Sequence, residues 1–535
     1  MFGVILALLI LPLVVAIVCF LVPAQAAMGL TITSGIACFG LVLALVPDAT
    51  HGAGTYLSYL RVDALSVVFL LATAFMYAAV SVYAAGYLKG RSDRYARRFY
   101  LGFNVFAWAM LAAPLMSSLA LLWIAIEVTT VVSALLVAIE DTDGAAEASW
   151  KYVLIASAGL GLGLLATIFA YYAGAQVLGV HSNLAIQPLI AAGPRLPKTP
   201  VELAFLLAVL GFGTKVGLVP VHTWLPDAHS EAPTPVSALL SGALLATSFY
   251  AILRFYQVAS AALGTGLPGD TLLAFGIASL LLASLYLFGQ RDIKRMLAYS
   301  SVEHMGILAI GVSFGAPIAL AGVMLHVLAH AAAKGNAFMG AGVFTVKYGT
   351  KQISLMRDGL RLLPWSGPMF LLAIFALCAI PPFGIFRSEF EIVSGGLNSA
   401  GNAAAALLVI LVTIAFLGLT ASLSRVLLTE PAEKAPVEVK TAAMAAVGTG
   451  PVGGANGAGG THAVSGAHAD GAAMSVERLG HEQSAGPLTP GEPSAWMVVP
   501  VLAGLAVLVL LGIHPPADLT NLIAQAAAEL RGVGR

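Results

Sequence analysis

Runs of about 20 apolar residues recur along almost the whole chain, and a helix of that length spans the hydrocarbon of a bilayer. Only 10% of the 535 residues are charged and 59% are hydrophobic, whereas about 25% of residues in a soluble protein are charged. A spanning segment must satisfy its backbone polar groups internally. We therefore predict an all-α membrane protein that crosses the bilayer many times.

The apolar runs predict about fourteen transmembrane helices. They lie near residues 2–22, 28–46, 62–88, 99–118, 120–139, 150–173, 202–225, 235–259, 271–289, 294–313, 317–345, 364–394, 402–428 and 494–513. The first run lacks a basic leader and is long enough to span, so we expect a retained helix. The basic connections LKGRSDRYARR, QRDIKR and KYGTKQISLMRDGLR would be cytoplasmic if both termini lie outside the cytoplasm, as the positive-inside rule predicts.

The chain divides into five predicted parts. Residues 1–98 hold helices 1–3, residues 99–260 hold helices 4–8, and residues 261–428 hold helices 9–13. Residues 429–492 are rich in Gly and Ala and cannot build a core, so we predict a disordered cytoplasmic loop. Residues 493–535 hold helix 14 and an amphipathic C-terminal tail.

Two of the predicted helices are interrupted. Helix 7 contains GFGTKVGLVP and helix 12 contains ALCAIPPFGIFRSEF, and the prolines remove backbone donors within the membrane. Broken helices at corresponding positions of two halves are typical of repeats that line a polar pathway. We therefore predict two inverted five-helix repeats, helices 4–8 and 9–13.

Charged residues recur inside the predicted spans, where they are costly and usually functional. They are Glu127 in helix 5, Lys151 in helix 6, Lys215 in helix 7, Lys334 in helix 11 and Glu389 in helix 12. Burial weakens the hold of a lysine on its proton and a nearby carboxylate strengthens it, so a movement of Glu127 relative to Lys215 would act as a proton switch.

Helix 11 contains LHVLAHAAAKGNAF, in which His326, His330 and Lys334 recur at i, i+4 and i+8. This spacing places three titratable groups on one stripe of the helix. A single intramembrane histidine most often only bonds to a neighbouring helix. Three at this spacing favour a proton relay.

Other polar residues have two interpretations each. His222 and His229, in HTWLPDAHSEAPTP, either shape proton uptake or cap a turn. Glu303 and His304 on helix 10 either extend the relay or bond across the bundle, and we favour the structural role. Arg61 and Asp63 at the start of helix 3 are predicted to be interfacial anchors.

No cofactor or metal site is expected in this chain. The three cysteines are separated along apolar runs, without the close spacing of metal or cluster ligands, and His462 and His468 are isolated. The formal net charge is zero, which gives no indication of nucleic-acid binding.

The sequence resembles a known family through three motifs in order. GTKVGLVPVHTWLPDAHSEAPTPVSALLSG is similar to the helix 7–8 motif of the proton-pumping, antiporter-like subunits of respiratory complex I, Mrp-type cation/proton antiporters and group 4 nickel-iron hydrogenases. QRDIKRMLAYSSVEHMGIL and LHVLAHAAAKGNAF resemble its helices 10 and 11. The wording SSVEHMGI looks most like the hydrogenase-4 component F branch of this family. The resemblance covers about residues 60–428.

The resemblance implies roles for the buried charges. Glu127 and Lys215 match a switchable ion pair, Lys151 the lysine beside it, Lys334 the central lysine and Glu389 the terminal group of the path.

One departure concerns helix 8. Several relatives carry a His or Lys there that bridges the two halves, but this chain has SALLSGALLATSFY. Ser241, Ser237 or water would have to fill the gap.

The resemblance further implies a non-catalytic, proton-translocating subunit in a bacterial or archaeal inner membrane. Its partners would be other membrane subunits and a soluble redox module of the hydrogenase or NADH dehydrogenase type. Two alternatives stay open: a subunit of an Mrp-like Na⁺/H⁺ antiporter, or the membrane coupling subunit of a complex that hydrates CO₂ and accumulates bicarbonate. Buried Lys and His repel cations and supply few oxygen ligands, which favours protons over sodium.

Overall fold

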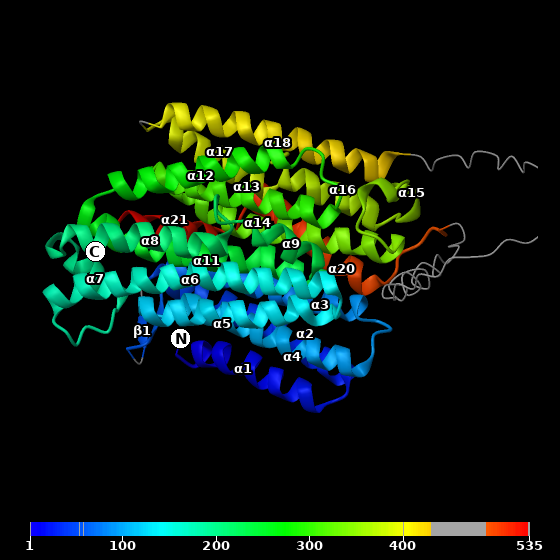
Figure 1. Cartoon of the computed structure of the whole chain (residues 1–535), viewed down its shortest axis with the longest axis horizontal. Coiled ribbons are helices and arrows are strands. Elements are labelled where there is room, and N and C mark those ends of the chain that lie inside the picture. The colour runs from blue at the N-terminus through cyan, green and yellow to red at the C-terminus, as the bar shows by residue number, and fades with distance from the viewer. Residues whose placement is uncertain (1, 53, 57, 400, 430–487, 533–535) are drawn as a thin grey trace, which may run out of the picture. The chain divides into compact units, whose positions relative to one another are not determined.

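The computed structural model describes residues 2–52, 54–56, 58–399, 401–429 and 488–532. Residues Met1–Thr429 and Pro490–Arg535 form one unit, whose long helices run side by side in a common direction (Figure 1). Most of the loop predicted at 429–492 lies outside the described residues.

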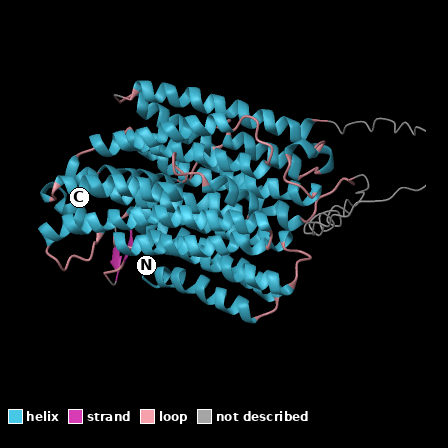
Figure 2. Ribbon diagram, viewed as in Figure 1, coloured by secondary structure: helices cyan, strands magenta, loops and turns pink. Residues whose placement is uncertain are grey.

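Nearly every element is a helix, as Figure 2 shows. The long helices are α1 (Phe2–Leu21), α2 (Ala24–Thr50), α3 (Ala64–Tyr87), α4 (Asp93–Ala112), α5 (Leu119–Val137), α6 (Asp143–Leu178), α8 (Lys198–Val216), α11 (Leu245–Leu263), α12 (Gly266–Tyr286), α13 (Ile293–Ser313), α14 (Pro317–Tyr348), α18 (Asn402–Leu428) and α20 (Ala495–Ile513). Shorter helices are α7 (Ile186–Ala192), α9 (Trp224–Glu231), α10 (Thr234–Leu239), α15 (Gly359–Leu362), α16 (Ser366–Leu377), α17 (Gly384–Leu397) and α21 (Ala517–Arg531). A small hairpin, β1 (Gly54–Tyr56) antiparallel to β2 (Leu60–Val62), precedes α3 and was not predicted.

Eleven helices of the described chain are long and apolar enough to cross a membrane. The remaining predicted segments correspond to α4, to α13 and to the pair α16 and α17. Charged residues lower the mean hydropathy of α4 and α13, and a break shortens the pair. The all-α membrane fold is thus confirmed, while the exact number of crossings and the inverted repeats stay predictions.

Both predicted helix breaks are present. Helix α8 ends at Val216, Gly217 adopts a φ of +84°, and α9 begins at Trp224. A side chain at Gly217 would be strained at this φ and would meet Leu225. In the second half, residues 378–383 separate α16 from α17 and contain the Pro-Pro pair.

A third irregularity lies within the predicted helix 235–259. A π-helical segment, η4 (Leu240–Leu244), joins α10 to α11. Such segments widen one turn of a helix and are frequent at functional sites. The segment contains Ser241, one of the residues expected to bridge the two halves.

Burial identifies the central helices. The most apolar window of α10–α11 is completely buried and that of α14 is 89% buried, whereas those of α1 and α18 are each 33% buried. Polar groups on α14 therefore lie in the interior of the bundle. The predicted C-terminal tail is the helix α21, which buries Leu522, Ile523 and Ala526 and packs against α2, α3 and α14.

Candidate functional site

Lys215, in the last turn of α8, is completely buried. Its Nζ donates a hydrogen bond to Thr130 Oγ1 on α5 over 3.0 Å and another to the hydroxyl of Tyr152 on α6. The ammonium also lies 4.5 Å from the centre of the Tyr152 ring. Three helices thus supply one polar pocket around a single lysine.

Tyr152 extends this pocket. Its hydroxyl lies 2.7 Å from Ser133 Oγ, and Ser133 in turn donates to the carbonyl of Thr129 over 2.6 Å. The Tyr152 ring stacks on Trp224 of α9 at a centroid distance of 4.3 Å. The first residue of the half-helix after the break therefore holds the tyrosine against Lys215.

Glu127 is not paired with Lys215 in this structure. No oxygen of Glu127 lies within 4.0 Å of Lys215 Nζ, and Glu127 Oε1 instead accepts a hydrogen bond from Ser157 Oγ over 3.3 Å. Within the described chain, the other oxygen of Glu127 is buried without a hydrogen-bond partner. The ion pair implied by the family resemblance is therefore in a separated arrangement.

Lys151 is not buried beside this pair, as the sequence predicted. Its side chain is 40% exposed and its Nζ pairs with Glu147 at 2.5 Å and with Asp227 at 3.8 Å. Adjacent residues of a helix point about 100° apart. Because Tyr152 takes the inward direction, Lys151 is turned toward the surface of the described chain.

Lys334, on α14, is completely buried. Its Nζ donates to the carbonyl of Leu297 over 3.1 Å and to Ser300 Oγ, both on α13. Neutral oxygens therefore receive two of its N–H groups. Glu303, one turn later on α13, interacts with Lys334 electrostatically; its Oε2 has no hydrogen-bond partner in the described chain.

Ser241 connects the first half to this lysine, as one of the sequence alternatives proposed. Its hydroxyl lies 2.7 Å from Ser301 Oγ, and Ser301 donates to the same Leu297 carbonyl that accepts from Lys334. Ser237 takes no part, because it donates to the His229 carbonyl over 2.8 Å.

Three histidines and a carboxylate gather beyond Lys334. His304 Nδ1 lies 3.1 Å from His326 Nε2 and 4.0 Å from Glu389 Oε1. The ring of His330 is centred 5.3 Å from that of His304, and His326 Nδ1 lies 2.9 Å from Ser388 Oγ. The predicted stripe on α14 is therefore joined by groups from α13 and α17, and His304 belongs to the cluster.

A polar cavity of about 1270 Å³ opens at one end of the bundle. Its lining includes Glu140, Asp292, Lys294 and Lys351, all in connections predicted to be cytoplasmic. Lys294 Nζ donates to the carbonyls of Ser230 and Ala232, at the end of α9. The break and its half-helix therefore lie between this cavity and the lysines.

The two histidines of the first break differ. His229 is completely buried, stacks on Phe338 at a centroid distance of 5.2 Å, and has no hydrogen-bond partner on either ring nitrogen within the described residues. It interacts electrostatically with Lys294 and Lys334. His222 lies in the non-helical connection and is 8% exposed. Of the two, His229 is placed between the cavity and Lys334.

Comparison with known proteins assigns the family. The profile of the NADH:quinone oxidoreductase/Mrp antiporter transmembrane family matches residues 116–417. The chain belongs to this family. The matched range contains every residue of the buried series described above.

Individual relatives agree with this assignment. A hydrogenase-4 component F homolog of Methylacidiphilum infernorum (isolate V4) is 35% identical over 363 residues, which are 66% of this chain and 76% of that protein. A chain of the Mrp complex from Dietzia sp. DQ12-45-1b superposes with a TM-score of 0.78 at 22% identity, covering 98% of this chain and 97% of that one. A chain of respiratory complex I from Thermus thermophilus gives 0.75 at 21% identity, covering 98% and 99%. The structural neighbours establish that this chain shares the antiporter-family fold.

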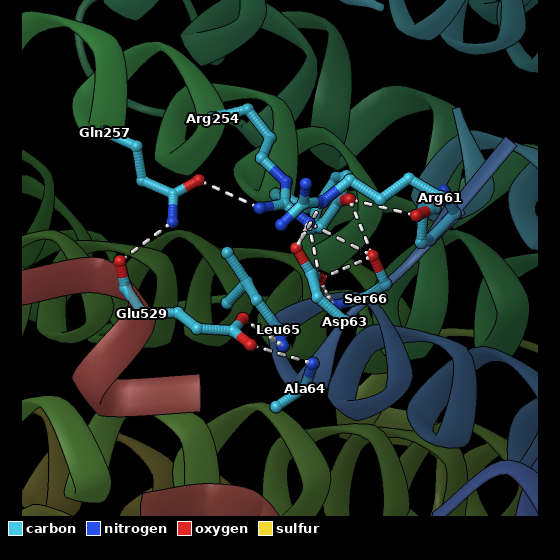
Figure 3. A network of polar contacts seen from close by, with 10 residues as sticks. Arg61, Asp63, Ala64, Leu65, Ser66, Arg254, Gln257 and Glu529 are labelled. Atoms are coloured by element: carbon cyan, nitrogen blue, oxygen red, sulfur yellow. Dashed lines mark hydrogen bonds and ion pairs between the residues drawn. The ribbon is translucent and has the colours of Figure 1, made fainter. Parts of the chain in front are cut away.

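A second polar network lies outside the buried series of this antiporter-family protein. Asp63, before the first turn of α3, is completely buried and binds Arg254 of α11 at 2.6 and 2.8 Å and Arg61 at 2.9 Å (Figure 3). Burial opposes ionisation of Asp63, but the two guanidinium groups outweigh it and hold its pKa below the usual range. Asp63 is therefore a buried structural ion, and the predicted role as an interfacial anchor is wrong.

The C-terminal helix joins the same network. The carboxylate of Glu529 accepts hydrogen bonds from the backbone N–H groups of Ala64 and Leu65 at 3.2 and 3.0 Å, and Gln257 donates to the Glu529 carbonyl (Figure 3). Burial, and the nearby charge of Asp63, raise the pKa of Glu529 from 4.5 to about 7. A carboxylate of α21 therefore caps the first turn of α3.

Sequence reasoning missed the neutral members of the site, namely Thr130, Ser133, Tyr152, Ser300 and Ser388. None of them breaks the apolar pattern of a transmembrane helix, so none gives a charge signal. A hydroxyl aligned with an inward lysine would have indicated them only once the helix contacts were known.

Proposed function

We propose that this chain is a proton-translocating membrane subunit of a multisubunit respiratory-type complex. One observation carries the proposal: buried lysines, histidines and carboxylates extend from the pocket of Lys215 to Glu389, with hydroxyl groups beside them. Ionisable groups inside a membrane protein are costly and mark ion or proton pathways. The family membership of the chain supports the same function.

The first step takes place at Lys215. A carboxylate near a buried ammonium stabilises its charge, and withdrawal of the carboxylate weakens the hold on the proton. In the present arrangement Lys215 is held by Thr130 and Tyr152, while Glu127 bonds to Ser157. This arrangement favours proton release, and approach of Glu127 would favour proton uptake.

The second step moves a proton to Lys334. Ser241, Ser301 and the Leu297 carbonyl form a polar connection that reaches Lys334 from the first half. Waters would complete the route from Lys215 to Ser241. The π-helical turn presents the Ser241 hydroxyl to α13, where relatives of the chain use a longer side chain.

The third step leads from Lys334 to Glu389. His330, His304 and His326 lie between α14 and α13, and a neutral imidazole can accept a proton at one nitrogen and release another from the second. The 3.1 Å contact between His304 and His326 is short enough for direct transfer. Glu389, on the half-helix α17, then releases the proton to the opposite side.

Protons reach the series from the polar cavity lined by Asp292 and Lys294. His229 lies between this cavity and Lys334 and is the better candidate for uptake than His222. The cavity-lining connections are those predicted to be cytoplasmic, which supports uptake from that side.

The redox chemistry belongs to partner subunits in our proposal. The relative from Methylacidiphilum infernorum is named a hydrogenase-4 component F homolog, which supports a hydrogenase-type soluble module in a bacterial or archaeal inner membrane. Charge movement in the neighbouring subunit would drive Glu127 toward or away from Lys215.

The test is proton pumping by the purified whole complex in proteoliposomes. Mass spectrometry of the co-purified subunits identifies the redox module and supplies the substrate for turnover. Lys215→Ala should abolish pH-gradient formation while the complex still assembles, whereas Lys198→Ala, an exposed position on the same helix, should pump normally. Pumping by Lys215→Ala at the wild-type rate, or a strict requirement for Na⁺, would contradict the proposal.

A further inference from the structure

We propose that His304, His326 and Glu389 form a binding site for a divalent transition-metal ion, with Zn²⁺ as the best match. The three side chains come from α13, α14 and α17, and each is buried. One ligand atom of each lies within 4.8 Å of the other two. Because the residues are far apart in sequence, the site was not predicted from the chain.

The separations suit a tetrahedral ion. Zinc lies about 2.0–2.2 Å from His nitrogen and carboxylate oxygen, which places neighbouring ligand atoms roughly 3.3–3.5 Å apart in a tetrahedron. His304 Nδ1 is 3.1 Å from His326 Nε2 and 4.0 Å from Glu389 Oε1. A small rotation of the Glu389 side chain closes the difference, and a water molecule would supply the fourth ligand.

The orientation of His326 is already that of a metal ligand. Its Nδ1 lies 2.9 Å from Ser388 Oγ, and a donor bond from Nδ1–H leaves the lone pair of Nε2 directed at His304 and Glu389. Metal-binding histidines nearly always anchor their second nitrogen in this way. Ser388 directly precedes the ligand Glu389, so α17 supplies both the ligand and the anchor.

Two ligand side chains have unused polar atoms. Glu389 Oε1 and His304 Nε2 are buried and have no hydrogen-bond partner in the described part of the chain. Binding of the ion uses the lone pairs of His326 Nε2 and His304 Nδ1. The proton shared by these two nitrogens moves to His304 Nε2 or leaves, together with any proton on Glu389, so metal binding releases protons and weakens at low pH.

The surrounding charges permit a dication. Lys334 repels it, but Glu303 and Glu389 interact with each other electrostatically, and together they offset the charge of one divalent ion. A pair of buried carboxylates close to histidine nitrogens suits Zn²⁺, whereas Mg²⁺ and Ca²⁺ prefer an all-oxygen shell.

The consequence for transport rests on the proposed function. If these side chains carry the proton, an ion bound to them occupies the lone pairs that the proton needs. Zn²⁺ would then stop pumping without removing any protein group.

The site can be tested with the purified complex in lipid nanodiscs. Co²⁺ substitutes for Zn²⁺ and gives visible absorption bands whose intensity reports tetrahedral geometry, so binding is measured without activity. Wild type should show a tetrahedral Co²⁺ spectrum that Zn²⁺ abolishes by displacement. His326→Gln and Glu389→Gln should each weaken binding at least about tenfold, and Ser388→Ala, which keeps all three ligands, should also weaken it about tenfold.

The matched control is His229→Gln, since His229 is a buried histidine outside the site; it should bind Co²⁺ like wild type. Unchanged binding in the three site variants, or only an octahedral spectrum in wild type, would overturn the proposal. Zn²⁺ should also inhibit pumping by wild type. Tetrahedral binding without inhibition would keep the metal site and contradict the proton path through these residues.

Discussion

Lys215 Nζ donates a hydrogen bond to Thr130 Oγ1 over 3.0 Å. Thr130 lies three residues after Glu127 on α5, so the lysine bonds to a neutral hydroxyl close to the carboxylate with which the resemblance pairs it. A switch between two partners on one helix needs only a small movement of that helix or of the lysine side chain. The structure thus contains one of the two arrangements that such a switch requires.

Thr130→Val should reduce proton pumping by about tenfold or more. A hydrogen bond to a charged group contributes about 1.5–3 kcal/mol, and 1.4 kcal/mol corresponds to about tenfold in rate. The measurement is the initial rate of pH-gradient formation in proteoliposomes. Thr129→Val is the matched control, because Thr129 bonds only to the Ile126 carbonyl among the described residues, and equal losses in both variants would contradict a specific role for Thr130.

Lys151→Ala should retain most of the pumping activity. Lys151 is 40% exposed and pairs with Glu147 on its own helix, and exposed pairs of this kind contribute about 0.3–0.5 kcal/mol. The family resemblance alone would predict a large loss. The same proteoliposome assay separates the two expectations, and a loss as large as that of Lys215→Ala would place Lys151 in the path.

Ser241→Ala should slow transfer between the two halves about fivefold. It removes the 2.7 Å contact with Ser301, and a neutral hydrogen bond contributes about 1 kcal/mol. Ser284→Ala is the control, since Ser284 also bonds to a backbone carbonyl on another helix, that of Leu411, but lies on α12. Normal pumping by Ser241→Ala would show that the connection between the halves runs elsewhere.

The pH dependence of stability should report Glu529. Its pKa is raised from 4.5 to about 7, so the folded protein holds a proton that the unfolded chain has lost. The stability from this group is complete below about pH 4.5 and falls as the pH rises to 7, by up to about 3 kcal/mol. The charged groups that face it are Asp63 and Arg254.

Thermal unfolding in detergent between pH 4.5 and 8 measures this effect. Glu529→Gln should flatten the decline across that window, because an amide does not titrate. Gln525→Ala, one turn earlier on α21, should keep the wild-type slope. If Glu529→Gln and wild type lose stability in parallel as the pH rises, the raised pKa is not the cause.

The sequence was sufficient for the membrane helices and for both breaks, because length, hydropathy and proline placement are local properties. It also identified Lys215, Lys334 and Glu389, since a charge in an apolar run is conspicuous. It placed Lys151 wrongly, because hydropathy does not reveal which of two adjacent helix positions faces inward. The link from Asp63 to Arg254 spans 191 residues, and no local pattern could predict it.

The histidine cluster shows the same limit. The spacing of His326 and His330 on one helix was visible in the sequence, but their contacts with His304 and Glu389 depend on how three helices pack. The helix breaks explain part of this, since the second break starts α17 at Gly384 and brings Ser388 and Glu389 beside α14.

The most direct test of the switch uses four proteins: wild type, Glu127→Gln, Lys215→Met and the double variant, each examined for pumping and for thermal stability. If Glu127 switches Lys215, each single variant should lose pumping and the double variant should be little worse than either, because groups that act as one unit give strongly non-additive losses. A purely structural pair would lose several kcal/mol of stability when one charge is stranded and recover when both are removed. We predict no recovery of pumping in the double variant; pumping restored to the wild-type rate in that protein would contradict the account.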